Sequence, residues 1–327
     1  MDASGCRHAT AGRDGRGRSG LRRHRGAGRP PAAAQAPPRI VRALRHRCEA
    51  GLLRLLLWVC RLLGIEKASA LGGWMGRLVG RFASGKNRIA RRNITAAMPE
   101  QSAEEVDAII DEMWDTIGRY MGEMPFLHEI DVYGGARVTV TSDMDLDAIT
   151  YPAIYFNAHF GNFEIPTLLA TQKGVPLTLV YREASNPYSE AIIQHWREKR
   201  GGTWVPKGRE GARALLAAIR NKGAIAILAD QKFNEGVAIP FFGRDAMTAP
   251  ALAELALKYD VPLYPVRVLR QPDAHFAVHV FKPVEIEKTG DRDTDVCATL
   301  LAINGIFEDW IRAHPGQWLW MHRRWPD

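Results

Sequence analysis

The chain has 327 residues, of which 46% are hydrophobic and 24% are charged, as in an average globular protein, so a wholly disordered chain is excluded. The length allows one large domain or two ordinary ones. The four cysteines lie scattered without a CxxC pair, which argues against a disulfide-rich scaffold and against a cysteine-rich zinc module.

The net charge of +8 conceals an asymmetry between the two parts of the chain. Residues 1–92 contain 21 lysines and arginines against 4 aspartates and glutamates, whereas residues 93–327 contain 23 against 32. This pattern predicts a basic N-terminal arm or anchor that meets an anionic surface, attached to a mildly acidic body.

Residues 1–39 consist of arginine, glycine, alanine and proline with almost no large apolar side chains. They cannot bury a core, so we expect a disordered arm. Such an arm either binds RNA or acidic lipid or is dispensable. No apolar stretch follows its first arginines, which argues against a secretory signal at this position.

Residues 40–66 have the pattern of an amphipathic helix. A leucine-rich run contains Trp58, and Arg47, Arg54 and Arg61 follow each other at intervals of seven. The uncharged run between Arg54 and Arg61 has six residues, whereas a spanning helix needs roughly 20. We therefore predict a helix in the membrane interface. The alternative is a core helix whose arginines reach solvent.

Residues 67–327 are expected to form a single α/β domain. A helical pattern covers residues 69–123, with a capping box at Ser102 and Glu105. Farther along, short strand-like runs alternate with helical stretches, which predicts a mostly parallel sheet flanked by helices. We place the strands at residues 137–141, 153–157, 176–180, 224–228, 263–269 and 276–281, and the helices between them at 163–172, 188–199, 211–221 and 250–259. A last helix covers 294–313.

The segment from Asn157 to Glu164 is the best candidate for a site, because it follows a strand and opens a helix. Open α/β sheets bind ligands at such strand ends. His159 is a natural general base for a hydroxyl nucleophile. Glu164 would lie about 140° from it on an ideal helix, so the two side chains meet only if a turn at Gly161–Asn162 folds the carboxylate back. The alternative is a purely structural His–Glu pair.

The sequence around His159 and Glu164 resembles that of the lysophospholipid acyltransferase superfamily. Within this superfamily it resembles the lipid A late acyltransferases, the lauroyl and myristoyl transferases of Gram-negative bacteria. The resemblance starts from the HFGNFE segment at His159–Glu164 and extends from about Leu52 to Trp325. Further blocks appear in the expected order at Asn87–Arg88, Arg92–Ile94, Met98–Glu100, Tyr181–Arg182, Asn186–Pro187, Asp230–Gln231, Phe241–Gly243 with Thr248, and Gln317–Trp325.

The resemblance implies a glycerolipid acyltransferase-like fold and the transfer of a fatty acyl chain from acyl carrier protein to a hydroxyl of a lipid A precursor. His159 would deprotonate that hydroxyl, which attacks the thioester directly. Glu164 would orient His159 and stabilise its charge. No metal, nucleotide or other cofactor is implied.

Further residues are expected around this pair. From position alone, backbone N–H groups at Gly161 and Asn162 are candidates for an oxyanion site at the helix start. By resemblance, Arg200 and Asp230 match an arginine and an aspartate that the family uses, with a structural ion pair between them as the alternative. The residues expected to bind substrate are Arg200, Asp230, Arg182, Arg323 and Arg324.

The implied partners are acyl carrier protein, an anionic glycolipid and the cytoplasmic face of the inner membrane, with no nucleic acid for the folded domain. Two alternatives stay open. One is an acyltransferase for another glycolipid of the phosphatidylinositol mannoside type, although those relatives usually carry aspartate where this chain has Glu164. The other is a catalytically inert membrane scaffold, against which the intact His159 and Glu164 argue.

Overall fold

The computed structural model describes residues 39–286 and 288–326. The expected arm, residues 1–39, lies outside this range except for Arg39, where the first helix begins. The helices are α1 Arg39–Leu63, α2 Ile65–Phe82, α3 Ser84–Ala97, α4 Ala103–Glu123, α5 Ile165–Gln172, α6 Pro187–Glu198, α7 Arg209–Arg220, α8 Ala251–Tyr259 and α9 Arg292–Ala313, with short 3-10 turns that include η1 Met124–Glu129 and η4 Pro315–Gln317.

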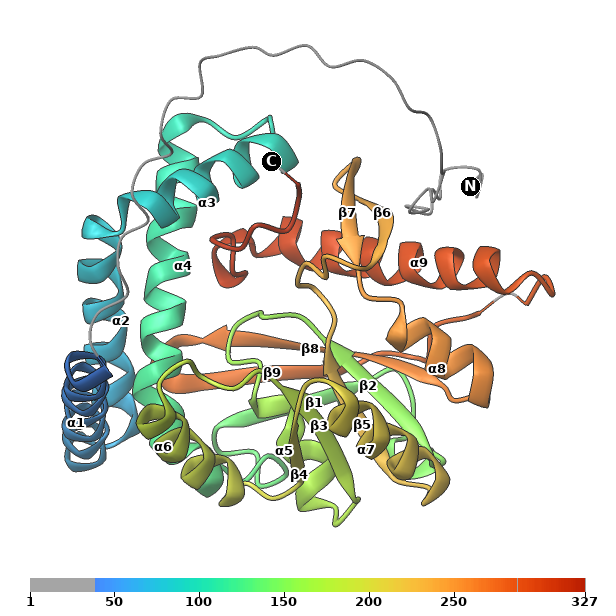
Figure 1. The fold of residues 1–327 in the computed structure, drawn as a ribbon, viewed down its shortest axis with the longest axis horizontal. Coiled ribbons are helices and arrows are strands. Elements are labelled where there is room, and N and C mark those ends of the chain that lie inside the picture. Colours follow the sequence, from blue (N-terminus) through green and yellow to red (C-terminus); the bar gives the residue numbers. More distant parts are fainter. Residues whose placement is uncertain (1–38, 287, 327) are drawn as a thin grey trace, which may run out of the picture.

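A seven-stranded sheet forms the centre of the fold (Figure 1), and its strand order is β1-β9-β8-β2-β5-β3-β4. All neighbours are parallel except β8 and β9, so the prediction of a mostly parallel α/β sheet is confirmed. The strands are β1 Val138–Ser142, β2 Ala153–Asn157, β3 Leu177–Tyr181, β4 Thr203–Pro206, β5 Ala224–Leu228, β8 Leu263–Gln271 and β9 His275–Val280.

Two features escaped the sequence reading. The edge strand β4 has only four residues. The hairpin β6 Val237–Phe241 and β7 Arg244–Thr248 stands apart from the main sheet (Figure 1). Proline is rare inside strands, so Pro240 in β6 argued against a strand there. Both residues of the turn, Phe242 and Gly243, have positive φ, as a tight hairpin requires.

The two faces of the sheet bury different helices. Ile154 and Phe156 of β2 pack in the cluster that contains side chains of α7, α8 and α9, whereas Tyr155 packs on the opposite side, towards α5. Alternate residues of one strand thus cover both faces, as expected for a parallel strand buried on both sides.

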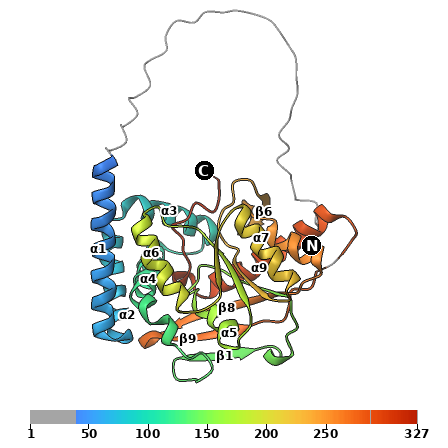
Figure 2. The same cartoon turned by 60° about the horizontal axis from the view of Figure 1, so that its bottom comes forward.

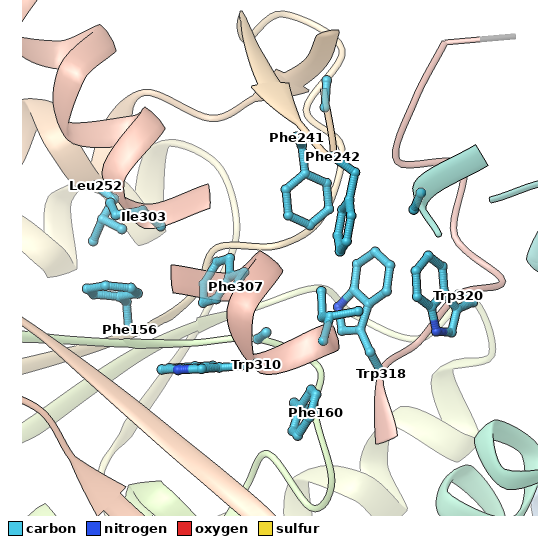
Figure 3. Close-up of a cluster of buried hydrophobic side chains, with 14 of the residues drawn as sticks. Phe156, Phe160, Phe241, Phe242, Leu252, Ile303, Phe307, Trp310, Trp318 and Trp320 are labelled. Atoms are coloured by element: carbon cyan, nitrogen blue, oxygen red, sulfur yellow. The ribbon is translucent and has the colours of Figure 1, made fainter. Parts of the chain in front are cut away.

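An aromatic cluster connects the sheet to the end of the chain (Figure 3). Trp318 and Trp320 are at most 2% exposed and lie near Phe241 and Phe242 of the hairpin. Phe160, from the segment after β2, belongs to the same cluster and forms an isolated bridge with Trp318. The C-terminal tryptophans are therefore core residues that hold the segment after β2 in place.

Helix α1 lies along one edge of the molecule, beside α2 and α6 (Figure 2). Leu57 is 3% exposed and packs against Met124 and Ile192. Arg47 donates to the Tyr188 hydroxyl, and Arg61 forms an ion pair with Glu129. The predicted arginine stripe thus contacts the domain at two of its three positions. No helix among the described residues is long and apolar enough to cross a membrane.

Helices α2 and α4 approach each other closely at glycines. A Cβ atom at Gly118 would lie 2.0 Å from the carbonyl oxygen of Gly72, and one at Gly76 would lie 2.1 Å from that of Trp114. The atoms that such a Cβ would meet belong to the backbone, which cannot move aside as a flexible side chain can. This contact fixes α4, whose C-terminal turn reaches the site described below.

We expect Gly118→Ala to destabilise the protein by about 1–3 kcal/mol, because the added methyl group forces two helices apart. Gly305→Ala in α9 is the matched control, because a Cβ there meets nothing within 4 Å, and it should be neutral or stabilising. Chemical denaturation of both variants measures the difference. Equal stability of the two variants would contradict the close approach.

Candidate active site

Two neighbouring strands bring His159 and Asp230 together. Asn157 ends β2, Leu228 ends β5, and these two residues pair in register in the parallel sheet. His159 and Asp230 each follow two positions later, and the Ala229 N–H continues the pairing by donating to the Asn157 carbonyl. Because parallel strands end at the same edge, both side chains reach the carboxyl edge of the sheet.

Asp230 holds His159 through both its backbone and its ring. Asp230 Oδ1 lies 2.8 Å from His159 Nδ1, and Oδ2 accepts from the His159 N–H at 3.0 Å and from the Trp318 indole N–H at 2.8 Å. Burial raises the pKa of Asp230, but the charge and hydrogen bonds of His159 and the bond from Trp318 outweigh it and lower the pKa to about 2. A carboxylate only accepts, so Nδ1 carries a proton, and in the neutral form of the ring Nε2 holds the lone pair.

Two polar side chains lie close to the His159 ring. The Gln231 amide nitrogen lies 3.0 Å from Nε2 and 3.4 Å from Nδ1 of this ring, so it sits over the ring face, and it lies 3.1 Å from His322 Nε2. Burial, followed by repulsion from His159, lowers the pKa of His322. His322 is therefore neutral near pH 7 and accepts from Gln231.

The expected contact of Glu164 with His159 is wrong, because Asp230 occupies Nδ1 of the ring. Glu164 already has helical backbone angles (φ −89°, ψ −20°) at the start of α5, so the turn before it does not fold its carboxylate back. Its Oε1 accepts from the Tyr120 hydroxyl at 2.9 Å, and its Oε2 lies 2.5 Å from Arg200 Nη1. Burial, followed by the charge of Glu164, raises the pKa of Tyr120 well above its usual value, so the hydroxyl stays protonated.

Arg200 and Asp230 do not form the ion pair considered as an alternative. Arg200 is 6% exposed and pairs with Glu164, whereas Asp230 pairs with His159. As a direct substrate contact, Arg200 is contradicted by this burial, because its guanidinium already faces a carboxylate.

One of the two oxyanion candidates already has a hydrogen-bond partner, and the other stays a prediction. The Gly161 N–H donates to the Gln317 carbonyl at 2.9 Å. Asn162 is fully buried, and its side-chain amide, not its backbone N–H, donates to Glu123 Oε2 at 2.8 Å. Glu123 in turn holds Arg270 in a buried ion pair. These residues anchor the HFGNFE segment, and of the two predicted N–H groups that of Gly161 is engaged by Gln317.

The remaining arginines separate into two kinds. Arg324 is fully buried and donates to the Met247 carbonyl, the Thr248 hydroxyl and Asn304. Its expected contact with an anionic substrate is therefore wrong. Arg182, which follows β3, and Arg323 have exposed side chains, so both stay candidates for substrate contact.

Sequence reasoning missed Tyr120, Glu123 and Trp318 as neighbours of the site. Tyr120 and Glu123 lie on α4, about 40 residues before the motif, and no local pattern connects them to it. Trp318 is part of the C-terminal block that carries the resemblance, which was the available signal. Within the described parts of the chain, no three histidine, cysteine, aspartate or glutamate side chains gather as metal ligands.

Glu164→Gln should destabilise the protein by about 3–5 kcal/mol, because Arg200 would be left as a buried charge without its partner. The double variant Glu164→Gln/Arg200→Met removes both charges and should recover part of that loss. Denaturant melts of the wild type, both single variants and the double variant measure the coupling. Additive losses would show that the pair does not act as a unit.

Comparison with known proteins identifies the family. The sequence matches the model of the family described as bacterial lipid A biosynthesis acyltransferase over residues 42–327. The lauroyltransferase of lipid A biosynthesis from Escherichia coli (strain K12) is 24% identical over 278 residues, which are 82% of this chain and 88% of that protein. The palmitoleoyltransferase of lipid A biosynthesis from the same strain is 24% identical over 281 residues, again 82% of this chain and 88% of that protein.

The myristoyltransferase of that strain is 24% identical over 204 residues, which are 59% of this chain and 62% of the relative, less than two thirds of its length. The matched residues of the family model include the whole site and both strands that bring His159 and Asp230 together. The chain therefore belongs to the bacterial lipid A biosynthesis acyltransferase family.

Proposed function

We propose that the protein transfers a fatty acyl chain from acyl carrier protein to a hydroxyl of a lipid A precursor. The observation that carries this proposal is His159, whose Nδ1 lies 2.8 Å from a carboxylate oxygen of buried Asp230, so that the neutral ring has its lone pair at Nε2. This is the protonation state that a general base requires. The Asp230 carboxylate would stabilise the imidazolium formed during the reaction.

The chemical steps follow from this geometry. The acceptor hydroxyl approaches Nε2 of His159, gives up its proton there and attacks the thioester carbonyl carbon. The tetrahedral intermediate then collapses, the carbon–sulfur bond breaks, and the thiolate takes the proton back from His159. The acyl chain ends as an ester on the acceptor, and no serine or cysteine nucleophile takes part.

The surroundings of the site support an anionic acceptor. The side chains of Lys86 and Arg182 are exposed, and both lie near enough to His322 to lower its pKa. Arg323, the residue directly after His322, also has an exposed side chain. Basic side chains at the opening would attract the charged head group of a glycolipid.

An apolar pocket on the α5 side of the sheet is our candidate for the acyl chain. It is lined mainly by apolar and aromatic side chains, among them Leu146, Ile149 and Tyr155. Asn157 and Thr167, which flank the HFGNFE segment, belong to the same lining. The pocket thus extends from the neighbourhood of the motif into the apolar interior.

Membrane attachment is the second part of the proposal, and α1 and α2 support it. Leu52, Leu55, Trp58 and Leu62 are exposed on α1, with more than half of each side chain accessible. Trp74, Leu78, Val79 and Phe82 are exposed on the neighbouring α2. Together these side chains form an apolar surface beside exposed arginines, as in proteins that lie in the interface of an anionic membrane. We place the protein at the cytoplasmic face of the inner membrane, where acyl carrier protein is available.

His159→Ala should lower kcat by about 10²–10⁴-fold, the usual worth of positioned proton transfer. Asp230→Asn should lower kcat by a similar factor. The His159 ring would no longer be held in one tautomer, and its protonated form would lose the neighbouring negative charge. The double variant should be little worse than the worse single variant. The measurement is transfer of labelled acyl groups from acyl carrier protein to a lipid A precursor, with thermal melts beside it.

Near-normal turnover of folded His159→Ala would contradict the assignment, as would a covalent acyl-enzyme trapped with the labelled donor. The two alternatives are tested in the same assay. Faster transfer to a phosphatidylinositol mannoside would identify another acceptor, and absence of thioester consumption in the wild type would identify an inert scaffold.

Replacing Leu55, Trp58 and Leu62 together with glutamine should release the protein from membranes into the soluble fraction, because each apolar side chain contributes roughly 1.5–3 kcal/mol on leaving water. Leu57 is left unchanged because it is buried against the domain. The matched control replaces the leucines with methionine and Trp58 with phenylalanine, which keeps the surface apolar. Equal sedimentation of both triple variants with vesicles would show that another surface holds the protein.

A further inference from the structure

Helix α7 exposes a row of basic side chains. Arg209, Arg213 and Arg220 are all exposed, and at about 100° per residue they lie within about 40° of one another around the helix axis. Lys207 and Lys222, which are also exposed, lie two residues before and two residues after the helix. We call these five side chains the α7 stripe.

The α7 stripe contrasts with the charge of the domain that carries it. Residues 93–327 contain 23 basic against 32 acidic side chains, whereas residues 207–222 contain five basic side chains and one acidic side chain, Glu210. Glu210 lies about 100° away from Arg209 around the helix. None of the five stripe side chains forms a hydrogen bond or an ion pair with a described residue. The stripe is therefore available to the carboxylates of another molecule.

The stripe begins at the edge of the sheet that carries the site. Lys207 follows β4, and its N–H donates to the carbonyl of Tyr181, the last residue of β3. Strands β2, β5, β3 and β4 are parallel neighbours in this order. The end of β4 therefore lies three strand spacings, about 14 Å, from the end of β2 that precedes His159. An acyl carrier protein holds its thioester on a long phosphopantetheine arm, which can cover such a distance.

The stripe is turned away from the proposed membrane surface. Helix α7 lies on the opposite side of the α/β unit from α1 and α2 (Figure 1, Figure 2). The exposed apolar side chains of α1 and α2 form the surface that we propose to lie in the membrane interface. A bilayer that meets this surface does not reach α7. The stripe therefore faces the aqueous side, from which a soluble carrier protein arrives.

The stripe is also separate from the basic side chains at the opening of the site. Lys86 and Arg182 lie near His322 and come from α3 and from the segment after β3. We assigned them above to the anionic acceptor. Two groups of basic side chains match two anionic substrates, a lipid at the opening and an acidic protein that brings the thioester from the side.

We propose that the α7 stripe docks the acyl carrier protein through carboxylates on an acidic surface of that protein. The proposal rests on the acyl transfer proposed above and identifies where its donor binds. Charges at the rim of an interface act mainly on the rate of association and on its salt dependence. The stripe should therefore set the KM for the donor and leave kcat unchanged.

The test compares two thioester donors of the same acyl chain, acyl carrier protein and pantetheine, with the full-length protein in vesicles and a lipid A precursor as acceptor. Arg209→Glu/Arg213→Glu should raise the KM for the carrier-protein donor by about tenfold at low salt, with kcat unchanged. The increase should shrink at high salt, where charges are screened. With the pantetheine donor, which has no acidic protein, the variant and the wild type should have equal KM and kcat.

Two control variants separate the charge of the stripe from other effects. Arg209→Lys/Arg213→Lys keeps the charge and should keep the donor KM of the wild type. Lys67→Glu/Lys282→Glu changes the net charge equally at two exposed side chains outside α7 and should also keep that KM. Melting temperature and sedimentation with vesicles should be the same for Arg209→Glu/Arg213→Glu as for the wild type.

Four results would overturn the docking role. The first is an unchanged carrier-protein KM in Arg209→Glu/Arg213→Glu, and the second is an equal increase of KM with both donors. The third is an equal increase in Lys67→Glu/Lys282→Glu, which would make net charge the cause. The fourth is loss of sedimentation with vesicles in Arg209→Glu/Arg213→Glu, which would place α7 at the membrane.

The same experiment separates failure of docking from failure of the function. A wild type that transfers from neither donor refutes the acyl transfer itself. Transfer from pantetheine alone refutes the carrier protein as donor and, with it, the docking. Transfer from both donors with a KM that does not depend on the stripe refutes only the docking. A gel shift with single-stranded RNA that Arg209→Glu/Arg213→Glu abolishes, beside an unchanged donor KM, would assign the stripe to nucleic acid instead.

Discussion

The site depends on one buried carboxylate that accepts hydrogen bonds from distant parts of the chain. Asp230 follows β5, and it binds the backbone and ring of His159 after β2 and the indole of Trp318 near the C-terminus. A buried charge is costly unless its lone pairs are satisfied. Here the two bonds from His159 satisfy part of this charge and also orient the imidazole ring. Stabilisation of Asp230 and orientation of His159 are therefore one interaction.

Helix α4 provides the second support of the motif. Tyr120 and Glu123 lie on its last turn and bind Glu164 and Asn162 of the HFGNFE segment. Their positions are set by the glycine contact between α2 and α4, which allows the two backbones to touch. The carboxylates Glu123 and Glu164 are balanced by Arg270 and Arg200. The motif is thus held between the sheet edge and a helix that does not belong to the α/β unit.

More of the fold than of the contacts within the site could be predicted from the sequence. Strand and helix alternation is local, so β2 and β5 were placed at their observed residues, whereas the hairpin with Pro240 was missed. His159 and Asp230 were both predicted for the site, because strand ends can be read from a pattern. Their pairing could not be read, since it depends on β2 and β5 being neighbours in the sheet although β3 and β4 lie between them in the chain. The same holds for Glu164, whose partner Arg200 lies two residues after the end of α6 and not in the turn beside Glu164.

The bridge between Phe160 and Trp318 has a consequence for the order of biosynthesis. Residues 317–325 supply the indole on Asp230, the carbonyl that binds Gly161, and His322 beside Gln231. A ribosome makes these residues after the whole seven-stranded sheet has been synthesised. The growing chain can therefore form its sheet before the site around His159 is complete. Translation that stops shortly before residue 317 would yield a protein with nearly all of its fold and without the chemistry.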